Sequence, residues 1–99
     1  MKNSQMEQTI NFRNRDRYVG EVKDNEPNGQ GIDYYANGEK YVGEFKDGDF
    51  NGQGRLTQKD GTFQDGLWGE NDYGYGTYSF SNGNIYIGAE NFDKVKSVI

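Results

Sequence analysis

Two segments of the chain alternate between side chains that suit a buried face and side chains that suit water. In residues 18–22, Tyr18 and Val22 fall on one side of an extended backbone, and Glu21 falls on the other. The same pattern returns 23 positions later, in residues 41–45. A period of two is typical of a β-strand with one buried face, so both segments are predicted to be strands.

Glycines recur at fixed distances from these strands. A Gly-x-Gly pair follows each strand start by eleven and thirteen residues, and an Asn-Gly or Asp-Gly pair comes seven residues after the second glycine. These positions are Gly29, Gly31, Asn37 and Gly38 in the first copy, and Gly52, Gly54, Asp60 and Gly61 in the second. A third copy starts at Phe63, one residue early, and returns to register at Gly74 and Gly76. A fourth copy starts at Tyr86, and residues 8–17 look like a trailing half-repeat.

Each Asn-Gly or Asp-Gly pair predicts a two-residue hairpin turn, because both turn positions need a positive φ. The turns at 37–38, 60–61 and 82–83 would join strands at about 31–35, 54–58 and 76–80 to strands at about 40–45, 62–67 and 85–89. The segments 23–30, 46–53 and 68–75 would form longer connections between hairpins. With 9–13 and 17–22 added, the chain contains about eight short strands.

Stacked copies would align apolar residues in columns on one face of the sheet. The columns are Tyr18, Tyr41, Phe63 and Tyr86; Val22, Phe45 and Leu67; Phe12, Tyr35 and Phe80, broken by Gln58; and Ile10, Leu56 and Tyr78, broken by Asp33. The predicted fold is all-β, a single-layer twisted antiparallel sheet built from tandem hairpins. We expect a flexible N-terminus over 1–7, the sheet over 8–90 and a C-terminal cap over 91–99, a short amphipathic helix with apolar residues at i, i+3, i+6 and i+7.

The whole recurring pattern runs aromatic-x-Gly-Glu, then Gly-x-Gly, then Asn-Gly or Asp-Gly. It resembles the MORN (membrane occupation and recognition nexus) repeat. The resemblance covers residues 8–90, with two copies that match closely, one that matches partly, and partial copies at each end. It implies a sheet of MORN-type hairpins that acts as a binding or targeting module, and it implies membrane lipid as an alternative ligand.

Composition narrows the classes of function. Hydrophobic residues make up 31% of the 99 residues and aromatic residues alone 15%, so large rings would supply much of the buried area. The formal net charge of −5 argues against nucleic-acid binding and disfavours electrostatic docking on an anionic membrane. The absence of cysteine is compatible with a cytoplasmic protein. No apolar run reaches the ~20 residues of a membrane span, and the polar start of the chain predicts no signal peptide.

No set of residues suggests catalysis. The chain has no His and no Cys, so we expect neither an enzyme nor a bound cofactor. Residues 47–52 match the first half of a calcium-binding EF-hand loop, with oxygens at positions 1, 3 and 5 and Gly at position 6. The bidentate Glu of position 12 is replaced by Gln58, and both flanks predict strands. Polar turn chemistry explains the segment, so no metal site is predicted.

The sequence therefore predicts a non-catalytic binding module or scaffold that takes a helix or an extended segment of a partner protein on an aromatic-lined face. The candidate binding residues are Tyr18, Tyr35, Tyr41, Phe45, Phe50, Trp68, Tyr73, Tyr75 and Tyr78. Four of these rings, Phe50, Trp68, Tyr73 and Tyr75, fall in or beside the predicted connections. There they would either anchor a partner or fold back over the rim of the sheet.

Other ligands stay open at this point. Arg13, Arg15 and Arg17 form a local basic cluster that could meet a phosphate. The phosphate would belong to a membrane phospholipid, or to a small nucleotide-like molecule whose ring stacks on the aromatic face. A solvated sheet edge, balanced by Asp16 and the acidic loops, is the favoured explanation of the cluster. Association with a second copy of the chain is also open.

Overall fold

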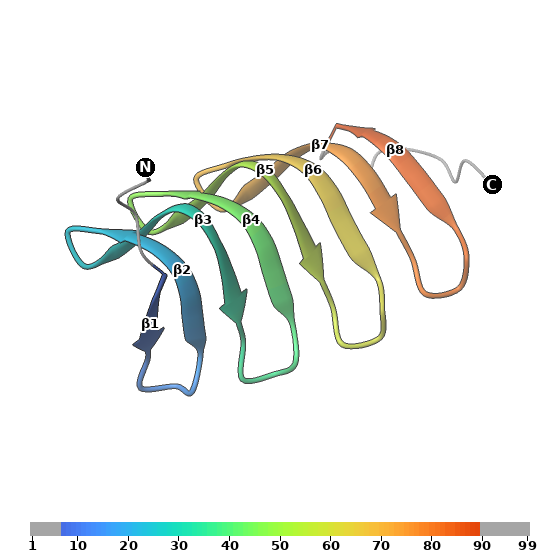
Figure 1. Cartoon of the computed structure of the whole chain (residues 1–99). Helices are drawn as coiled ribbons and strands as arrows, with labels where there is room; N and C mark the ends of the chain where they lie inside the picture. Colours follow the sequence, from blue (N-terminus) through green and yellow to red (C-terminus); the bar gives the residue numbers. More distant parts are fainter. Residues whose placement is uncertain (1–6, 90–99) are drawn as a thin grey trace.

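The computed structural model describes residues 7–89, which form one antiparallel sheet of eight strands (Figure 1). The strands are β1 (Gln8–Asn11), β2 (Arg17–Lys23), β3 (Glu26–Tyr34), β4 (Lys40–Lys46), β5 (Asp49–Thr57), β6 (Phe63–Gly69), β7 (Asp72–Ser79) and β8 (Ile85–Ala89). Each strand pairs with its neighbours in sequence, so the order across the sheet is β1 to β8. The predicted all-β, single-layer antiparallel sheet is confirmed. The expected helix in residues 91–99 lies outside the described residues.

The sheet has two kinds of turn, one at each end of its strands. The Asn-Gly and Asp-Gly pairs lie in three-residue loops, in which only the glycine has a positive φ: Gly38 (96°), Gly61 (94°) and Gly83 (96°). This geometry is a type I turn followed by a residue in the left-handed region. The prediction of two-residue turns with two positive φ angles at these sites was wrong. In the β1–β2 loop, Arg15 (φ 77°) occupies the place that glycine takes in the other three loops.

The opposite ends of the strands are joined by tight two-residue turns, not by the longer connections that the sequence predicted. The turns are Asp24-Asn25, Asp47-Gly48 and Glu70-Asn71, and all six residues have a positive φ between 52° and 88°. Paired positive φ angles are the mark of a type I′ turn. Strands β3, β5 and β7 consequently begin directly after these turns and are longer than predicted.

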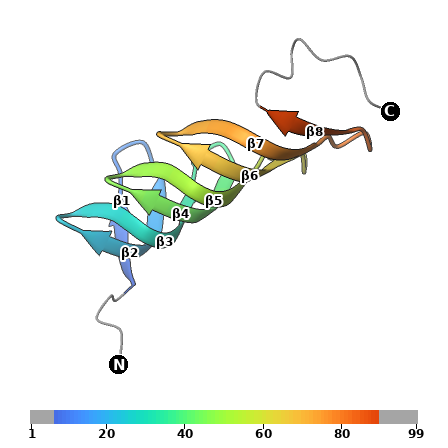
Figure 2. The ribbon, with the colours of Figure 1, turned by 90° about the horizontal axis from the view of Figure 1, so that it is seen from above.

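A row of glycines crosses seven consecutive strands and sets the shape of the sheet. Directly opposite one another lie Gly20, Gly31, Gly43, Gly54, Gly66, Gly76 and Gly88. A Cβ built on Gly31 would overlap the Tyr18 ring, and one built on Gly54 would overlap the Tyr41 ring. The glycines therefore leave the space in which the tyrosine rings lie against the backbone. The strands bend, and the sheet as a whole is curved (Figures 1 and 2).

The face that carries this glycine row, here called the inner face, also carries a row of larger side chains. The second row is Ile10, Tyr18, Asp33, Tyr41, Leu56, Gln64, Tyr78 and Tyr86. Gln64 holds the position predicted for Phe63, so the third copy starts 23 residues after the second. Likewise Trp68 pairs with Tyr73 as Phe45 pairs with Phe50 one copy earlier. Trp68, and not Leu67, therefore holds the position equivalent to Phe45. The predicted one-residue shift of the third copy was therefore wrong, because the aromatic residue at its start belongs to the other face.

Two glutamates of the repeat accept backbone hydrogen bonds at β-bulges of the sheet. The register of β2 and β3 shifts between Gly20 and Val22, and that of β4 and β5 shifts between Gly43 and Phe45. At these bulges the Gln30 amide donates to Glu21 Oε1 (2.7 Å), and the Gln53 amide donates to Glu44 Oε2 (3.1 Å). A bulge leaves backbone groups without ladder partners, so these carboxylates satisfy donors that the sheet cannot.

Candidate binding surface

The inner face is filled by the rings of the chain itself. The buried cluster consists of Tyr18, Tyr41, Phe45, Phe50, Trp68 and Tyr73, each at most 7% exposed. Tyr41 and Phe50 stack with ring centroids 3.8 Å apart and an interplanar angle of 6°. Phe45 meets Tyr41 edge-on at 5.1 Å. Such contacts add to the stability that area burial alone supplies, so this cluster is the hydrophobic core of the protein.

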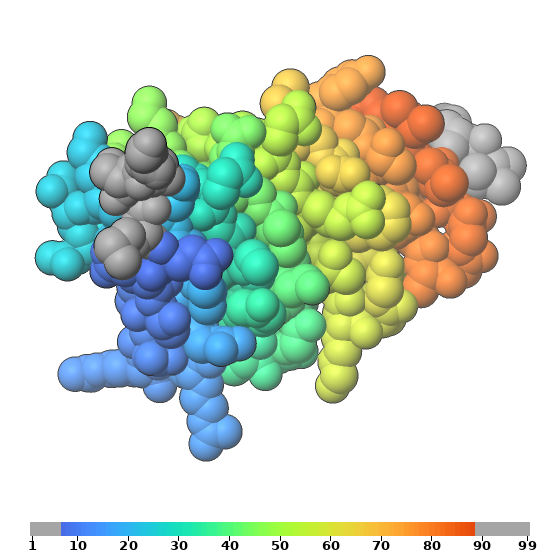
Figure 3. Space-filling view, viewed as in Figure 1, coloured from blue at the N-terminus to red at the C-terminus, as the bar shows by residue number. Residues whose placement is uncertain are grey.

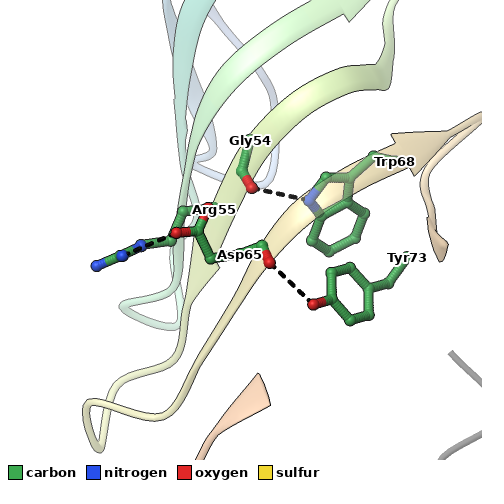
Figure 4. Close-up of polar contacts among 5 residues, drawn as sticks. All are labelled: Gly54, Arg55, Asp65, Trp68 and Tyr73. Carbon is green, nitrogen blue, oxygen red and sulfur yellow. Dashed lines mark hydrogen bonds and ion pairs between the residues drawn. The ribbon is translucent and has the colours of Figure 1, made fainter. Parts of the chain in front are cut away.

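Three of the rings that were predicted to lie in or beside connections belong to this core. Phe50 lies in β5, Trp68 in β6 and Tyr73 in β7, so their predicted placement was wrong. Trp68 Nε1 donates to the Gly54 carbonyl (3.1 Å), and Tyr73 Oη donates to the Asp65 carbonyl (2.9 Å), both shown in Figure 4. Burial raises the pKa of Tyr73 to about 12. These polar atoms are satisfied by backbone oxygens, which is how buried Tyr and Trp are normally accommodated.

The remaining three candidate rings differ in exposure. Tyr35 is half-buried and donates to Asp33 Oδ2 at 3.3 Å. Tyr78 is half-buried as well and stacks on Phe80 with centroids 4.4 Å apart. Tyr75 is 57% exposed, on the face opposite the core. Of the nine candidate binding residues, Tyr75 presents the largest fraction of its surface to solvent.

Tyr75 is part of an apolar patch on the outer face, at the C-terminal end of the sheet. Leu67 (47% exposed) is its direct partner on β6, and Ile87 (65% exposed) lies diagonally from it on β8. Ile85 (40% exposed) continues the patch along β8. We call these four residues the C-terminal outer patch. Neither Leu67, which was predicted to be a core residue, nor Ile87 was among the predicted binding residues. The alternation of Ile85 and Ile87 with Tyr86 and Gly88 nevertheless indicates two apolar faces on this strand.

The three arginines of the N-terminal cluster are dispersed. Arg17 lies on the outer face, with its guanidinium carbon 4.4 Å from the centroid of the Tyr34 ring. Arg15 holds the left-handed position of the β1–β2 loop, and in Figure 3 blue side chains at this N-terminal end extend away from the rest of the surface. Arg13 lines a depression of about 380 Å³ together with two carboxylates, Asp16 and Asp33. The structure therefore does not gather the three guanidinium groups at one site.

Asp33 is the unusual member of the inner row. It lies between Tyr18 and Tyr41, both fully buried, at the position that Leu56 fills one copy later. Its Oδ1 is buried and accepts no hydrogen bond from the part of the chain that the structure describes. Burial, aided by the charge of Asp16, raises the pKa of Asp33 to about 6, against a lowering effect of the Tyr35 hydroxyl. A carboxylate at this position opposes folding.

Replacing Asp33 by Asn should stabilise the protein at pH 8 by about 1–2 kcal/mol, a moderate gain because part of the carboxyl meets solvent. The folded state holds the proton of Asp33 more tightly than the unfolded chain does, so the penalty exists above the folded pKa of about 6. The advantage of Asp33→Asn should therefore shrink as pH falls from 7 to 4. Urea denaturation of both proteins across this range measures it. A difference independent of pH would show that ionisation of Asp33 is not the cause.

The middle of the outer face is polar. Arg55 Nη2 pairs with Asp65 Oδ2 at 2.9 Å, and the guanidinium carbon lies 3.9 Å from the centroid of the Phe63 ring. Figure 4 shows Arg55 on the side of the ribbon away from Trp68 and Tyr73. Half-exposed pairs of this kind contribute little to stability. The polar centre separates the C-terminal outer patch from the N-terminal half of the sheet.

The segment that resembles half of an EF-hand loop is part of the sheet. Asp47 and Gly48 form a type I′ turn, and Asp49 and Asn51 lie on β5. Asp49 Oδ1 accepts a hydrogen bond from Asn71 Nδ2 (2.8 Å) on the neighbouring turn. Within residues 7–89 no group of three or more His, Cys, Asp or Glu side chains could hold a metal ion.

These features define a single-layer β-repeat protein whose units are hairpins of 22 or 23 residues and whose core is a row of aromatic rings over glycines. The chain belongs to the MORN repeat family: the family model matches residues 18–40, 41–63 and 74–85, more than half of its length. No curated protein matches it. Repeats of this family are generally non-enzymatic modules that bind proteins or membranes. No helix in the described part of the chain is long and apolar enough to cross a membrane.

Proposed function

We propose that this protein is a non-catalytic module that binds a partner protein segment through the C-terminal outer patch. The observation that supports the proposal is the contiguous exposure of Leu67, Tyr75 and Ile87, at 47%, 57% and 65%. A tyrosine among exposed aliphatic side chains supplies a large contact area at a small cost in conformational entropy, which is why tyrosine is enriched at interfaces. The inner face is less suited to a partner, because its rings already pack on one another.

Charge indicates the chemistry of the partner segment. Between Leu67 and Tyr75, Glu70 in the turn and Asp72 at the start of β7 are both exposed, and the chain has a net charge of −5. An apolar segment flanked by Lys or Arg would match this surface, because complementary charges speed association and disfavour wrong partners. The same negative charge weakens attraction to an anionic membrane.

Changing Tyr75 to Ala should weaken binding to such a partner by roughly 10- to 100-fold, the effect of losing an aromatic anchor. The free energy of unfolding should change by less than about 0.5 kcal/mol, since the ring is largely exposed. Affinity capture from the native host with both proteins, followed by titration of the captured partner, measures the first effect.

Phe12→Ala is the matched control. Phe12 is also an exposed ring (44%), but it lies in the β1–β2 loop at the other end of the sheet. It should leave partner binding unchanged. Vesicles with an anionic phospholipid, offered to the same proteins at physiological salt, should bind weakly. Strong vesicle binding that survives Tyr75→Ala would replace the proposal with lipid recognition.

A further inference from the structure

A second surface lies on the outer face of strands β2–β6, where two rows of directly paired residues cross the sheet. The first row is Arg17, Tyr34, Lys40, Thr57 and Phe63, and the second is Val19, Ile32, Val42, Arg55 and Asp65. We call these two rows the central outer surface. It shares no residue with the C-terminal outer patch, and its middle strands, β4 and β5, are each three strands from the nearer edge strand.

The charges of the central outer surface are mostly positive, although the chain has a net charge of −5. The surface carries three cations, Arg17, Lys40 and Arg55, and one carboxylate, Asp65. Asp65 is already paired, because its Oδ2 accepts a hydrogen bond from Arg55 Nη2 at 2.9 Å. Lys40 is exposed and makes no hydrogen bond or ion pair with any residue in 7–89. The surface is therefore a positive region on an acidic protein.

Aromatic rings pack against two of these cations. The guanidinium carbon of Arg17 lies 4.4 Å from the centroid of the Tyr34 ring, and that of Arg55 lies 3.9 Å from the centroid of the Phe63 ring. A guanidinium group that lies over a ring keeps its N–H donors at its edge, in the plane in which a carboxylate binds. The rings therefore reduce the conformational freedom that each arginine would lose on binding an anion.

A depression of about 580 Å³ lies beside Lys40 and Arg55 on this surface. Gln30, Val42 and Gln53 also line it. Its volume is within the range of ligand sites in proteins. The side chains of Gln30 and Gln53 are exposed, and each offers a donor and an acceptor to a peptide backbone. Val42 is 41% exposed and supplies an apolar part of the lining.

The spacing of two cations selects among acidic ligands. Lys40 lies opposite Thr57, which is two residues from Arg55 on β5, so Lys40 and Arg55 are diagonal neighbours with Cα atoms about 7–8 Å apart. In an extended peptide, side chains two residues apart point to the same side and are separated by about 6.5–7 Å. Acidic residues at positions i and i+2 therefore match the two cations, whereas adjacent acidic residues point to opposite sides.

Larger anions fit this surface less well. A nucleic acid or an anionic membrane presents many charges over an area that extends beyond the two rows. It would also meet the exposed acidic residues of the neighbouring turns, Asp24, Asp47 and Glu70, which repel it. A short acidic peptide can contact the cations without reaching these turns.

We propose that the central outer surface binds an extended, acidic segment of a partner protein that carries Asp or Glu at positions i and i+2. One carboxylate pairs with Lys40 and the other with the guanidinium group of Arg55. The side-chain amides of Gln30 and Gln53 form hydrogen bonds with the peptide backbone. This site goes beyond the proposed function, because it uses other residues and takes a segment of the opposite charge.

The test uses the synthetic peptide Gly-Ser-Glu-Ala-Glu-Ser-Gly with blocked ends, titrated into the isotope-labelled full chain and followed by NMR. Amide signals of residues 40–43 and 53–57 should shift and reach saturation, and those of Ile85–Ala89 should not shift. A peptide with Gln in place of both Glu residues should bind about tenfold more weakly, and Gly-Ser-Ala-Glu-Glu-Ser-Gly should bind about threefold more weakly. The affinity should fall as the salt concentration rises.

Two lysine variants separate this site from general charge attraction. Lys40→Gln should weaken binding of the acidic peptide by roughly three- to tenfold, because it removes one of the two paired cations. Lys46→Gln is the matched control, since Lys46 is an exposed lysine of the same strand outside the depression. It should change the affinity by less than about twofold. Asp65→Asn should strengthen binding by about threefold, because Asp65 competes for Arg55.

Equal weakening by Lys40→Gln and Lys46→Gln would overturn the proposal. So would equal binding of the acidic and neutral peptides, or tighter binding of a single-stranded oligonucleotide with the same number of charges. Tyr75→Ala should leave binding of the acidic peptide unchanged. Loss of this site and loss of the C-terminal outer patch are therefore distinguishable.

Discussion

Replacing Gly54 by Ala is expected to lower the free energy of unfolding by about 3 kcal/mol or more, at the upper end of the range for overpacked cores. The added methyl group would overlap the ring of Tyr41, which is fully buried and cannot move outward. Tyr41 also stacks on Phe50 and meets Trp68 edge-on, so displacing it disturbs the centre of the core. Urea denaturation followed by circular dichroism measures the loss.

Gly69→Ala is the matched control for this prediction. Gly69 is also a strand glycine without a positive φ, and a Cβ built on it meets no atom within 4 Å. Its replacement should leave stability unchanged or raise it slightly, since alanine restricts the unfolded chain. If both variants lost the same stability, a general aversion of the sheet to larger residues would explain the result, and the contact with Tyr41 would not.

The double variant Gly54→Ala with Tyr41→Leu tests the contact itself. Tyr41→Leu alone should be destabilising because it removes a ring from the core. In the double variant the cost of Gly54→Ala should be smaller by about 1 kcal/mol or more, because the methyl group enters space that the ring has left. Strict additivity of the two losses would contradict the proposed overlap.

The sequence was sufficient to predict the architecture. A period of 23 residues, a strand alternation that returned in each copy and a regular glycine spacing were enough for the single antiparallel sheet and its strand order. This works because each hairpin contacts only its neighbours, so local pattern and global fold carry the same information. The repeat also predicted that Tyr18 and Tyr41 share one face, which the register confirms.

The turns were predicted less well, for a specific reason. Asn-Gly is the strongest signal for a two-residue turn, yet Asn37-Gly38 lies in a three-residue loop, where Asn37 Oδ1 accepts the Glu39 amide (2.9 Å). The true two-residue turns include Asp24-Asn25 and Glu70-Asn71, which have no glycine. Asp and Asn tolerate the left-handed region well enough that pairing of the flanking strands decides the conformation.

The binding surface was the hardest feature to predict. In a sheet of one layer, an aromatic side chain can remain exposed and bind a partner, or it can pack on its own neighbours. The sequence pattern is the same in both cases. The structure shows that Phe50 and Trp68 pack on their own neighbours. Their ring centroids lie 5.5 Å apart, and the Tyr41 ring lies 3.8 Å from Phe50 and 5.5 Å from Trp68. Leu67 was predicted to lie on the core face with Val22 and Phe45, and this was wrong because the third copy was assigned one residue out of register.

Replacing Trp68 by Ala is expected to lower the free energy of unfolding by about 3–5 kcal/mol, the usual cost of removing a buried indole. Trp68 is 7% exposed, lies edge-on to Phe50 and Tyr41, and packs against Tyr73 at 5.0 Å. The variant also leaves the Gly54 carbonyl without its side-chain donor. A domain of this size has a total stability of about 5–15 kcal/mol, so much of it would be lost.

Comparison with Tyr75→Ala decides between a core role and an anchor role for Trp68. The two residues lie on neighbouring strands but face opposite sides of the sheet, and Tyr75 is 57% exposed. Tyr75→Ala should melt within about 2 °C of the parent, whereas Trp68→Ala should melt lower by more than about 10 °C. Circular dichroism is the suitable probe, because Trp68 is the single tryptophan of the chain and fluorescence would lose its reporter.

If Trp68→Ala melted like the parent and yet lost its protein partner, Trp68 would be a binding residue, as its position beside a predicted connection first indicated. The packing of Trp68 on Phe50 and Tyr41 predicts the opposite, since a ring enclosed by its neighbours contributes to folding before any partner is present.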